Sequence, residues 1–205
     1  MEEKQRLERA NRDKACEQLS TEGRKHFELI EFDANEKLVT EIRKDPVGLF
    51  FIILTGAFIA GVLLLATVAI SSADLNSLFS TSGADSYKGI LVLVMFMLML
   101  LTGVGTFIGA FLYKSNVIYV TSEKIAQVVY TSLFRRKISQ LSIGDVQDVT
   151  VSQNGVLAHL FKYGTLVVET SGEQQNYNFS YVPEPYFISK AIVGAHEENL
   201  KLYGN

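Results

Sequence analysis

Two long stretches without a charged residue dominate the hydrophobic and polar pattern of the chain. They cover residues 47–70 and 89–113. A helix that crosses a membrane needs about 20 mostly apolar residues, because the hydrocarbon layer is about 30 Å thick and a helix rises about 1.5 Å per residue. Both stretches are long enough, so we expect two transmembrane helices joined by an external loop over residues 71–88. Buried helices of a soluble core are disfavoured, because two of them side by side would need a larger protein around them.

Small residues recur four positions apart within these stretches, at Ala57 and Gly61 and at Gly105 and Gly109. Residues at this spacing share one helix face, and small ones allow the close approach on which helix pairing in lipid depends. We expect them to pack either the two spans of one chain or several copies in a homo-oligomer. Neither span contains the charged residue that transporters and proton relays usually place there, which disfavours transport.

The segment before the first span, residues 1–46, is predicted to be a cytosolic N-terminal arm. Residues 1–26 are rich in charge and have only a thin apolar stripe, which favours a solvated helix or arm. Phe27 and the apolar residues that follow it are typical of a strand. The run from Lys37 to Arg43 fits either a second short strand or a helical lead into the membrane.

Residues 114–205 are predicted to form a cytosolic domain of short antiparallel strands followed by one helix. Runs with alternating apolar residues, separated by turn-forming residues, indicate the strands. These runs cover residues 117–121, 125–130, 137–141, 146–151, 166–170 and 176–181. The apolar residues of 183–201 recur at helical spacing, so this helix has one apolar face with which to close a sandwich or barrel.

The order of motifs after the second span resembles that of the bacterial pleckstrin-homology-like (PH-like), membrane-flanked family. The motifs are a Tyr-apolar-Thr strand, an Ile-x-x-Val stretch after a basic strand, and a Gly-x-apolar-x-apolar strand. They are Tyr119, Val120 and Thr121, then Ile143 and Val146, then Gly164, Leu166 and Val168. The resemblance implies a bent, seven-stranded antiparallel sheet or barrel capped by a C-terminal helix. The fold class is therefore a membrane α-helical hairpin with an α+β PH-like domain.

Charge and composition restrict the compartment and the partners. Residues 1–46 hold ten Lys and Arg, residues 71–88 hold one, and eight follow the second span, which predicts cytosolic termini in the inner or plasma membrane of the cell. The net charge of −3 gives no basic excess, and a nucleic-acid partner is not expected. The single cysteine, Cys16, excludes an intrachain disulfide.

The remaining candidate chemistry is sparse. The basic run Arg135, Arg136 and Lys137 is interpreted either as a contact with anionic lipid or as a solvated hairpin. The turn after Thr121 carries a single lysine beside a glutamate, whereas phosphoinositide-binding PH domains carry several basic residues there. His159 has apolar neighbours and is predicted to be packed between strands.

Three aromatic residues alternate along the last predicted strand, Tyr177, Phe179 and Tyr181, and so are expected on one face. We interpret them as core residues, with a peptide- or lipid-binding groove as the alternative. No phosphate loop, nucleophile elbow or zinc-ligand spacing is present, so neither catalysis, nor a cofactor, nor a metal is expected. The predicted function is a non-enzymatic, membrane-anchored interaction or scaffold module with an unknown protein partner. The alternative is a module that senses anionic lipid.

Overall fold

The computed structural model describes residues 2–33, 35–74, 84–170 and 177–204 and divides the chain into two compact units. The strand-rich unit comprises Met1–Gly48 and Leu112–Asn205, and the hairpin unit comprises Leu49–Phe111. Most of the predicted external loop, and position 176 of the last predicted strand, lie outside the described residues.

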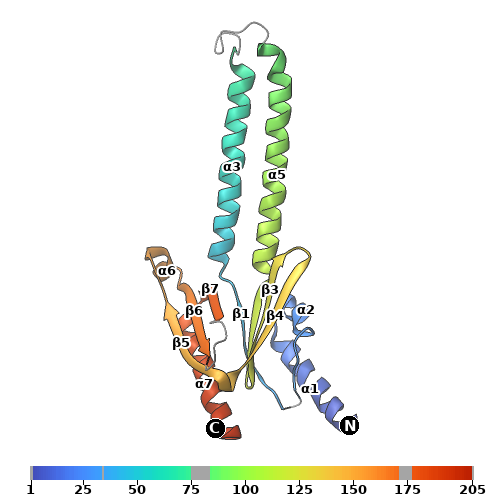
Figure 1. Cartoon of the computed structure of the whole chain (residues 1–205), viewed down its shortest axis with the longest axis vertical. Helices are drawn as coiled ribbons and strands as arrows, with labels where there is room; N and C mark the ends of the chain where they lie inside the picture. The colour runs from blue at the N-terminus through green and yellow to red at the C-terminus, as the bar shows by residue number, and fades with distance from the viewer. Residues whose placement is uncertain (1, 34, 75–83, 171–176, 205) are drawn as a thin grey trace. The chain divides into compact units, whose positions relative to one another are not determined.

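The strand-rich unit contains two antiparallel sheets (Figure 1). The strands of the first sheet, in spatial order, are β1 (Leu38–Arg43), β2 (Val117–Thr121), β3 (Lys124–Ser132) and β4 (Arg135–Ser142). Those of the second are β5 (Val146–Ser152), β6 (Tyr163–Thr170) and β7 (Tyr177–Pro183). The expectation of one bent sheet or a barrel is corrected in this respect: the short 3-10 helix η2 (Ile143–Asp145) separates β4 from β5, and the described strands do not close into a ring.

Strand β1 precedes the first apolar stretch, yet it belongs to the same sheet as the strands that follow the second. Arg43 pairs with Val117 and Ile42 with Ile118. The sheet therefore includes residues 38–43 in addition to strands of the domain predicted over 114–205. The run left open between a strand and a helical lead is a strand.

The main core lies between the two sheets and the C-terminal helix α7 (Pro185–Tyr203). Its fully buried members include Ile125, Leu166 and Ile192. The predicted amphipathic helix over 183–201 is thereby confirmed. It packs against β5 and η2, where its apolar face covers residues that strand pairing alone would leave exposed.

A second core forms where helices α1 (Glu2–Gln18) and α2 (Thr21–Phe27) cover the first sheet. Leu19 and Phe27 pack with Val117 and Tyr119 of β2, and the Tyr119 hydroxyl donates to the carbonyl of Gly23 at 2.5 Å. The predicted helix is present, but the end of α1 and α2 are packed rather than solvated, because every residue of β2 is buried and both of its faces need a cover. The strand predicted at Phe27 is wrong, because Phe27 ends α2.

The hairpin unit is built from α3 (Pro46–Ser72) and α5 (Lys88–Lys114), with a 3-10 turn η1 (Ala84–Tyr87) before α5. Each helix has 27 residues, so each is about 40 Å long. Both are long and apolar enough to cross a membrane. Their large apolar side chains point outward; Phe58, Leu65 and Phe107 are each at least 70% exposed.

Candidate functional site

The connections between sheet and helices are short and held by buried polar contacts. Two residues separate β1 from α3, and two separate α5 from β2. Asp45, in the first connection, is buried; its N–H donates to the carbonyl of Tyr181 at 2.7 Å, and its side chain accepts the N–H of Val47 at 2.9 Å. The Tyr113 hydroxyl donates to the carbonyl of Asp45 at 2.6 Å. These contacts fasten the start of α3 and the end of α5 to β7.

Aromatic rings surround this connection. The Tyr181 ring stacks on Tyr163, with 5.4 Å between centroids, and meets Tyr113 edge-on at 6.1 Å. Lys44 places its ammonium 5.2 Å from the Tyr113 ring centroid, and burial lowers the pKa of Lys44. A partly buried lysine against an aromatic face gains a cation–π contact in place of part of its hydration.

The prediction that three aromatic residues of β7 share one face is wrong for Tyr181. Phe179 is buried in the main core and Tyr177 packs against its edge. Tyr181 has a left-handed backbone (φ 58°), and the pairing register of β7 with β6 shifts between Gly164 and Leu166. This irregularity turns the Tyr181 ring toward the connection at Asp45.

A groove of about 180 Å³ lies beside the connection, between β7 and the ends of β1, β2 and β3. Its polar lining residues are Arg43, Lys44, Asn116, Gln127, Asn178 and Ser180, and its apolar ones include Ile42, Val129 and Phe179. Of the three aromatic residues interpreted as core residues, with a groove as the alternative, Phe179 alone lines this groove. The lining combines cationic, amide and hydroxyl side chains with apolar ones.

The basic run predicted from the sequence lies at the β3–β4 turn. Arg135, Arg136 and Lys137 are the first three residues of β4, and all are exposed. Phe134, the residue before them, is 98% exposed. The structure thus places the three cations on an open surface, which fits both interpretations of the run, contact with anionic lipid and plain solvation.

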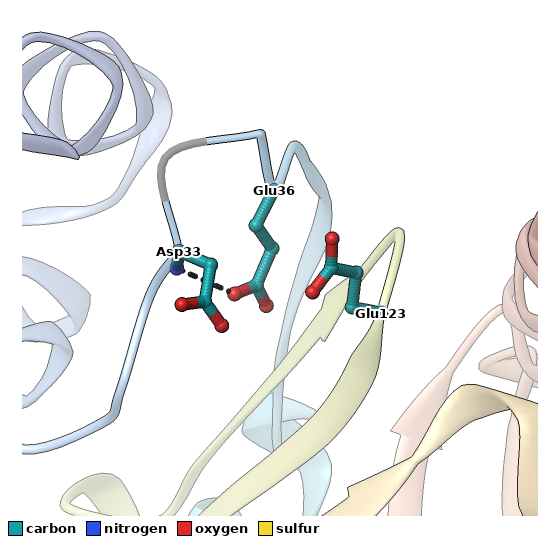
Figure 2. Close-up of side chains that lie close together, drawn as sticks. All are labelled: Asp33, Glu36 and Glu123. Atoms are coloured by element: carbon teal, nitrogen blue, oxygen red, sulfur yellow. Dashed lines mark hydrogen bonds between the residues drawn. The ribbon is translucent and has the colours of Figure 1, made fainter. Parts of the chain in front are cut away.

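Three carboxylates gather at the opposite end of the first sheet (Figure 2). Oxygens of Asp33, Glu36 and Glu123 lie within 4.8 Å of one another, and the N–H of Asp33 donates to Glu36 at 2.9 Å. The Lys124 ammonium lies 3.2 Å from Glu36 and 3.4 Å from Asp33. Because this cation already faces the carboxylates, we assign the cluster no metal. Burial alone would lower the pKa of Lys124, but the charge of Glu36 and the hydrogen bond with it outweigh burial and raise it.

The four small residues predicted to pack helices have different surroundings in the hairpin unit. A Cβ added at Gly109 would lie 3.5 Å from Ile52, so Gly109 is at the contact between α3 and α5. A Cβ at Gly61 or Gly105 would meet nothing within 4 Å, and Ala57 is exposed.

The sequence interpretation did not select Gly56, which is buried and lies so close to Thr106 that a Cβ would overlap it. Ala60, four positions further on, is also small, so the same spacing rule would have identified Gly56 as a helix-packing position.

His159 also departs from its prediction. It lies on the short helix α6 (Val156–Leu160), between β5 and β6, and its side chain is exposed rather than packed. Its Nδ1 lies 3.0 Å from the carbonyl of Gly155, in the preceding turn. Ala158 is the buried residue of this helix, so the apolar neighbours of His159 are themselves turned outward.

Comparison with protein families gives one match. The sequence profile described as "Bacterial PH domain" matches residues 48–192, more than half of the chain. The chain belongs to the bacterial PH domain family. This confirms the resemblance drawn from the strand motifs. Comparisons with curated proteins and with solved structures find no match. In this PH domain protein, β1, α1 and α2 lie outside the matched residues, whereas all but the first two residues of α3, all of α5 and β2–β7 lie within them.

Proposed function

We propose that this PH domain protein crosses the inner or plasma membrane of the cell twice, through α3 and α5. Both termini and the strand-rich unit lie in the cytosol, and residues 71–88 lie outside. The observation that supports this is the outward-facing apolar surface of both helices. In the most apolar 18 residues of each helix, at most 6% are buried. A surface of this kind is stable in lipid and not in water.

We further propose that the anchored domain is a non-enzymatic interaction or scaffold module. Connections of two residues, or three steps along the chain, hold the sheet within about 11 Å of each helix, because each extended step spans at most about 3.6 Å. Confinement at a surface raises the effective concentration of the domain for any partner on the same membrane. Families with PH-like domains are generally non-catalytic, and the groove lining described above agrees with a binding role.

Labelling of single cysteines in intact cells tests the topology. In a Cys16→Ser background, a membrane-impermeant maleimide should label Tyr87→Cys in intact cells, and Glu198→Cys only after the membrane is permeabilised. Labelling of Glu198→Cys in intact cells, or release of the protein by an alkaline wash, would reject the anchored topology. In-cell crosslinking followed by mass spectrometry then separates a scaffold of identical copies from recruitment of a different protein.

The second candidate, sensing of anionic lipid, is favoured by the exposure of Arg135, Arg136 and Lys137 at the start of β4. Near an anionic leaflet each such charge contributes about 1 kcal/mol. The full chain in nanodiscs of anionic or zwitterionic lipid should then show hydrogen-exchange protection of residues 132–138 only with anionic lipid. Equal protection in both lipids, or protection that survives replacement of all three by glutamine, would reject this candidate.

A further inference from the structure

Several large apolar side chains are exposed at one end of the strand-rich unit; at the other end, Leu202 and Tyr203 near the C-terminus are also exposed. Those at the first end lie in the β3–β4 turn, on and after α6, and in the first turn of α7. They are Phe134, Val156, Leu160, Phe161 and Phe187, with exposures from 51% to 98%. A water-facing surface rarely gathers so many large apolar groups without a contact that covers them.

The pairing register shows that the β3–β4 turn lies at the helix-bearing end of the first sheet. Val117, the first residue of β2, pairs with Arg43 on one side and Val128 on the other. Strand β3 continues four residues further, to Ser132, before the turn. At about 3.3 Å per residue, the turn projects about 13 Å beyond the point where α5 gives way to β2.

Hydrogen bonds place α6 and the start of α7 at the same end. The Asp45 N–H donates to Tyr181 near the end of β7, and the Glu184 N–H donates to the carbonyl of Lys162, just after α6. Figure 1 shows α6 and the β3–β4 turn at one end of the strand-rich unit, opposite the C-terminus. The polypeptide therefore enters α3 and leaves α5 between two loops that expose apolar groups.

The charged groups at this end suit an anionic surface. Arg135, Arg136 and Lys137 begin β4 directly after the β3–β4 turn, and Lys162 follows α6; all four are exposed. The exposed carboxylate residue Glu184, just before α7, adjoins Lys162, to whose carbonyl its N–H donates; four cations and this carboxylate leave the balance positive. Phenylalanine and leucine beside lysine and arginine are the composition of segments that insert shallowly into the headgroup region of a bilayer.

We propose that the β3–β4 turn and α6 insert together into the bilayer that α3 and α5 cross, and so fix the orientation of the PH domain on the membrane. The inference rests on the proposed membrane anchoring and adds a second, shallow contact to it. The occupant is the lipid interface, because the same end of the unit is continuous with both apolar helices. A domain seated in this way presents its opposite end, with the β2–β3 turn and the end of α7, to the cytosol.

Collision accessibility of nitroxide labels tests the proposal with the full chain in liposomes. In a Cys16→Ser background, labels go on Phe134→Cys, Val156→Cys, Val62→Cys within α3, and Glu198→Cys near the end of α7. Oxygen partitions into lipid and a nickel chelate stays in water. We expect labels at 134, 156 and 62 to favour oxygen, and the label at 198 to favour the chelate.

The outcomes separate the two proposals. A label at 62 that favours the chelate would reject the membrane span itself. A label at 62 in lipid with labels at 134 and 156 in water would reject the docking alone, as would labels at 134 and 156 shielded from both reagents by a second copy. Phe134→Asp should move the label at 156 toward water several-fold, whereas Leu202→Asp, at the opposite end, should leave it unchanged; no effect of Phe134→Asp would overturn joint insertion.

Discussion

Replacement of Glu36 by alanine should destabilise the packing of the N-terminal arm on the sheet, and the contacts of Glu36 give the size of the effect. The Glu36 side chain is fully buried. It accepts the Thr121 hydroxyl at 2.5 Å and the Asp33 N–H at 2.9 Å, and it faces the Lys124 ammonium at 3.2 Å. Removing one partner of a buried ion pair leaves the other charge without compensation, which destabilises by about 3–5 kcal/mol. An exposed pair contributes about 0–1 kcal/mol, so Glu22→Ala, which breaks the exposed pair with Lys25, is the matched control.

Cys16 provides the assay, because it is the only thiol of the chain and packs at the edge of the second core. A short pulse of a bulky maleimide at increasing urea, with the full chain in detergent micelles, reports exposure of this core. With an m-value of about 1–3 kcal/mol per molar urea, a loss of 3–5 kcal/mol lowers the midpoint by about 1 M or more. Equal midpoints for Glu36→Ala and Glu22→Ala would refute the reasoning. The double variant Glu36→Ala/Lys124→Ala should be more stable than Glu36→Ala alone, because it removes the uncompensated cation.

Three further predictions follow from individual contacts. Tyr119→Phe removes the hydroxyl that donates to the Gly23 carbonyl and should destabilise the arm by about 1–3 kcal/mol in the same urea assay, whereas Tyr186→Phe, on an exposed residue, should not. Gly56→Leu should reduce disulfide crosslinking between Ile52→Cys and Gly109→Cys in membranes, because a side chain at 56 overlaps Thr106, and Gly61→Leu should leave it unchanged; equal crosslinking would show that α3 and α5 pair elsewhere. The raised pKa of Lys124 stabilises the fold at pH values below its unfolded value of 10.5, and this contribution is lost as pH rises through the higher folded value; Lys124→Met should therefore flatten the loss of stability measured from pH 10 upward.

The sequence predicted those elements whose signals are local. The absence of charge over 47–70 and 89–113 marked both helices within two residues of their observed ends. Strand alternation marked β2–β7 for the same reason. Strand β1 was left open because Leu38–Arg43 fits two periodicities, and its partner lies beyond both helices.

Burial of the arm was missed, although Val117–Thr121 carried a usable signal. Apolar residues occupy both faces of this strand, with Val117 and Tyr119 on one and Ile118 and Val120 on the other. A strand apolar on both faces needs a cover on each. The rotation of Tyr181 had no such signal, because its positive φ depends on a register shift and on the hydrogen bond from Asp45, which join segments distant in sequence.

Strands β1 and β2 can pair although α3 and α5 lie between them in sequence, because packing of the two helices on each other shortens the loop that must be closed. Residues 44–116 separate β1 from β2, and closing a flexible loop of this length would cost about 4 kcal/mol beyond a constant term. The contact of Ile52 with Gly109 lies near the ends of α3 and α5, so a paired hairpin delivers the two strand ends already close together. Helix pairing thus offsets part of the entropic cost of closing the segment between β1 and β2. A short turn joining Lys44 to Asn116 would lower the same entropic cost in water, so loop closure alone does not account for the helices. Under the proposed anchoring, what the helices add is attachment of the sheet to the membrane.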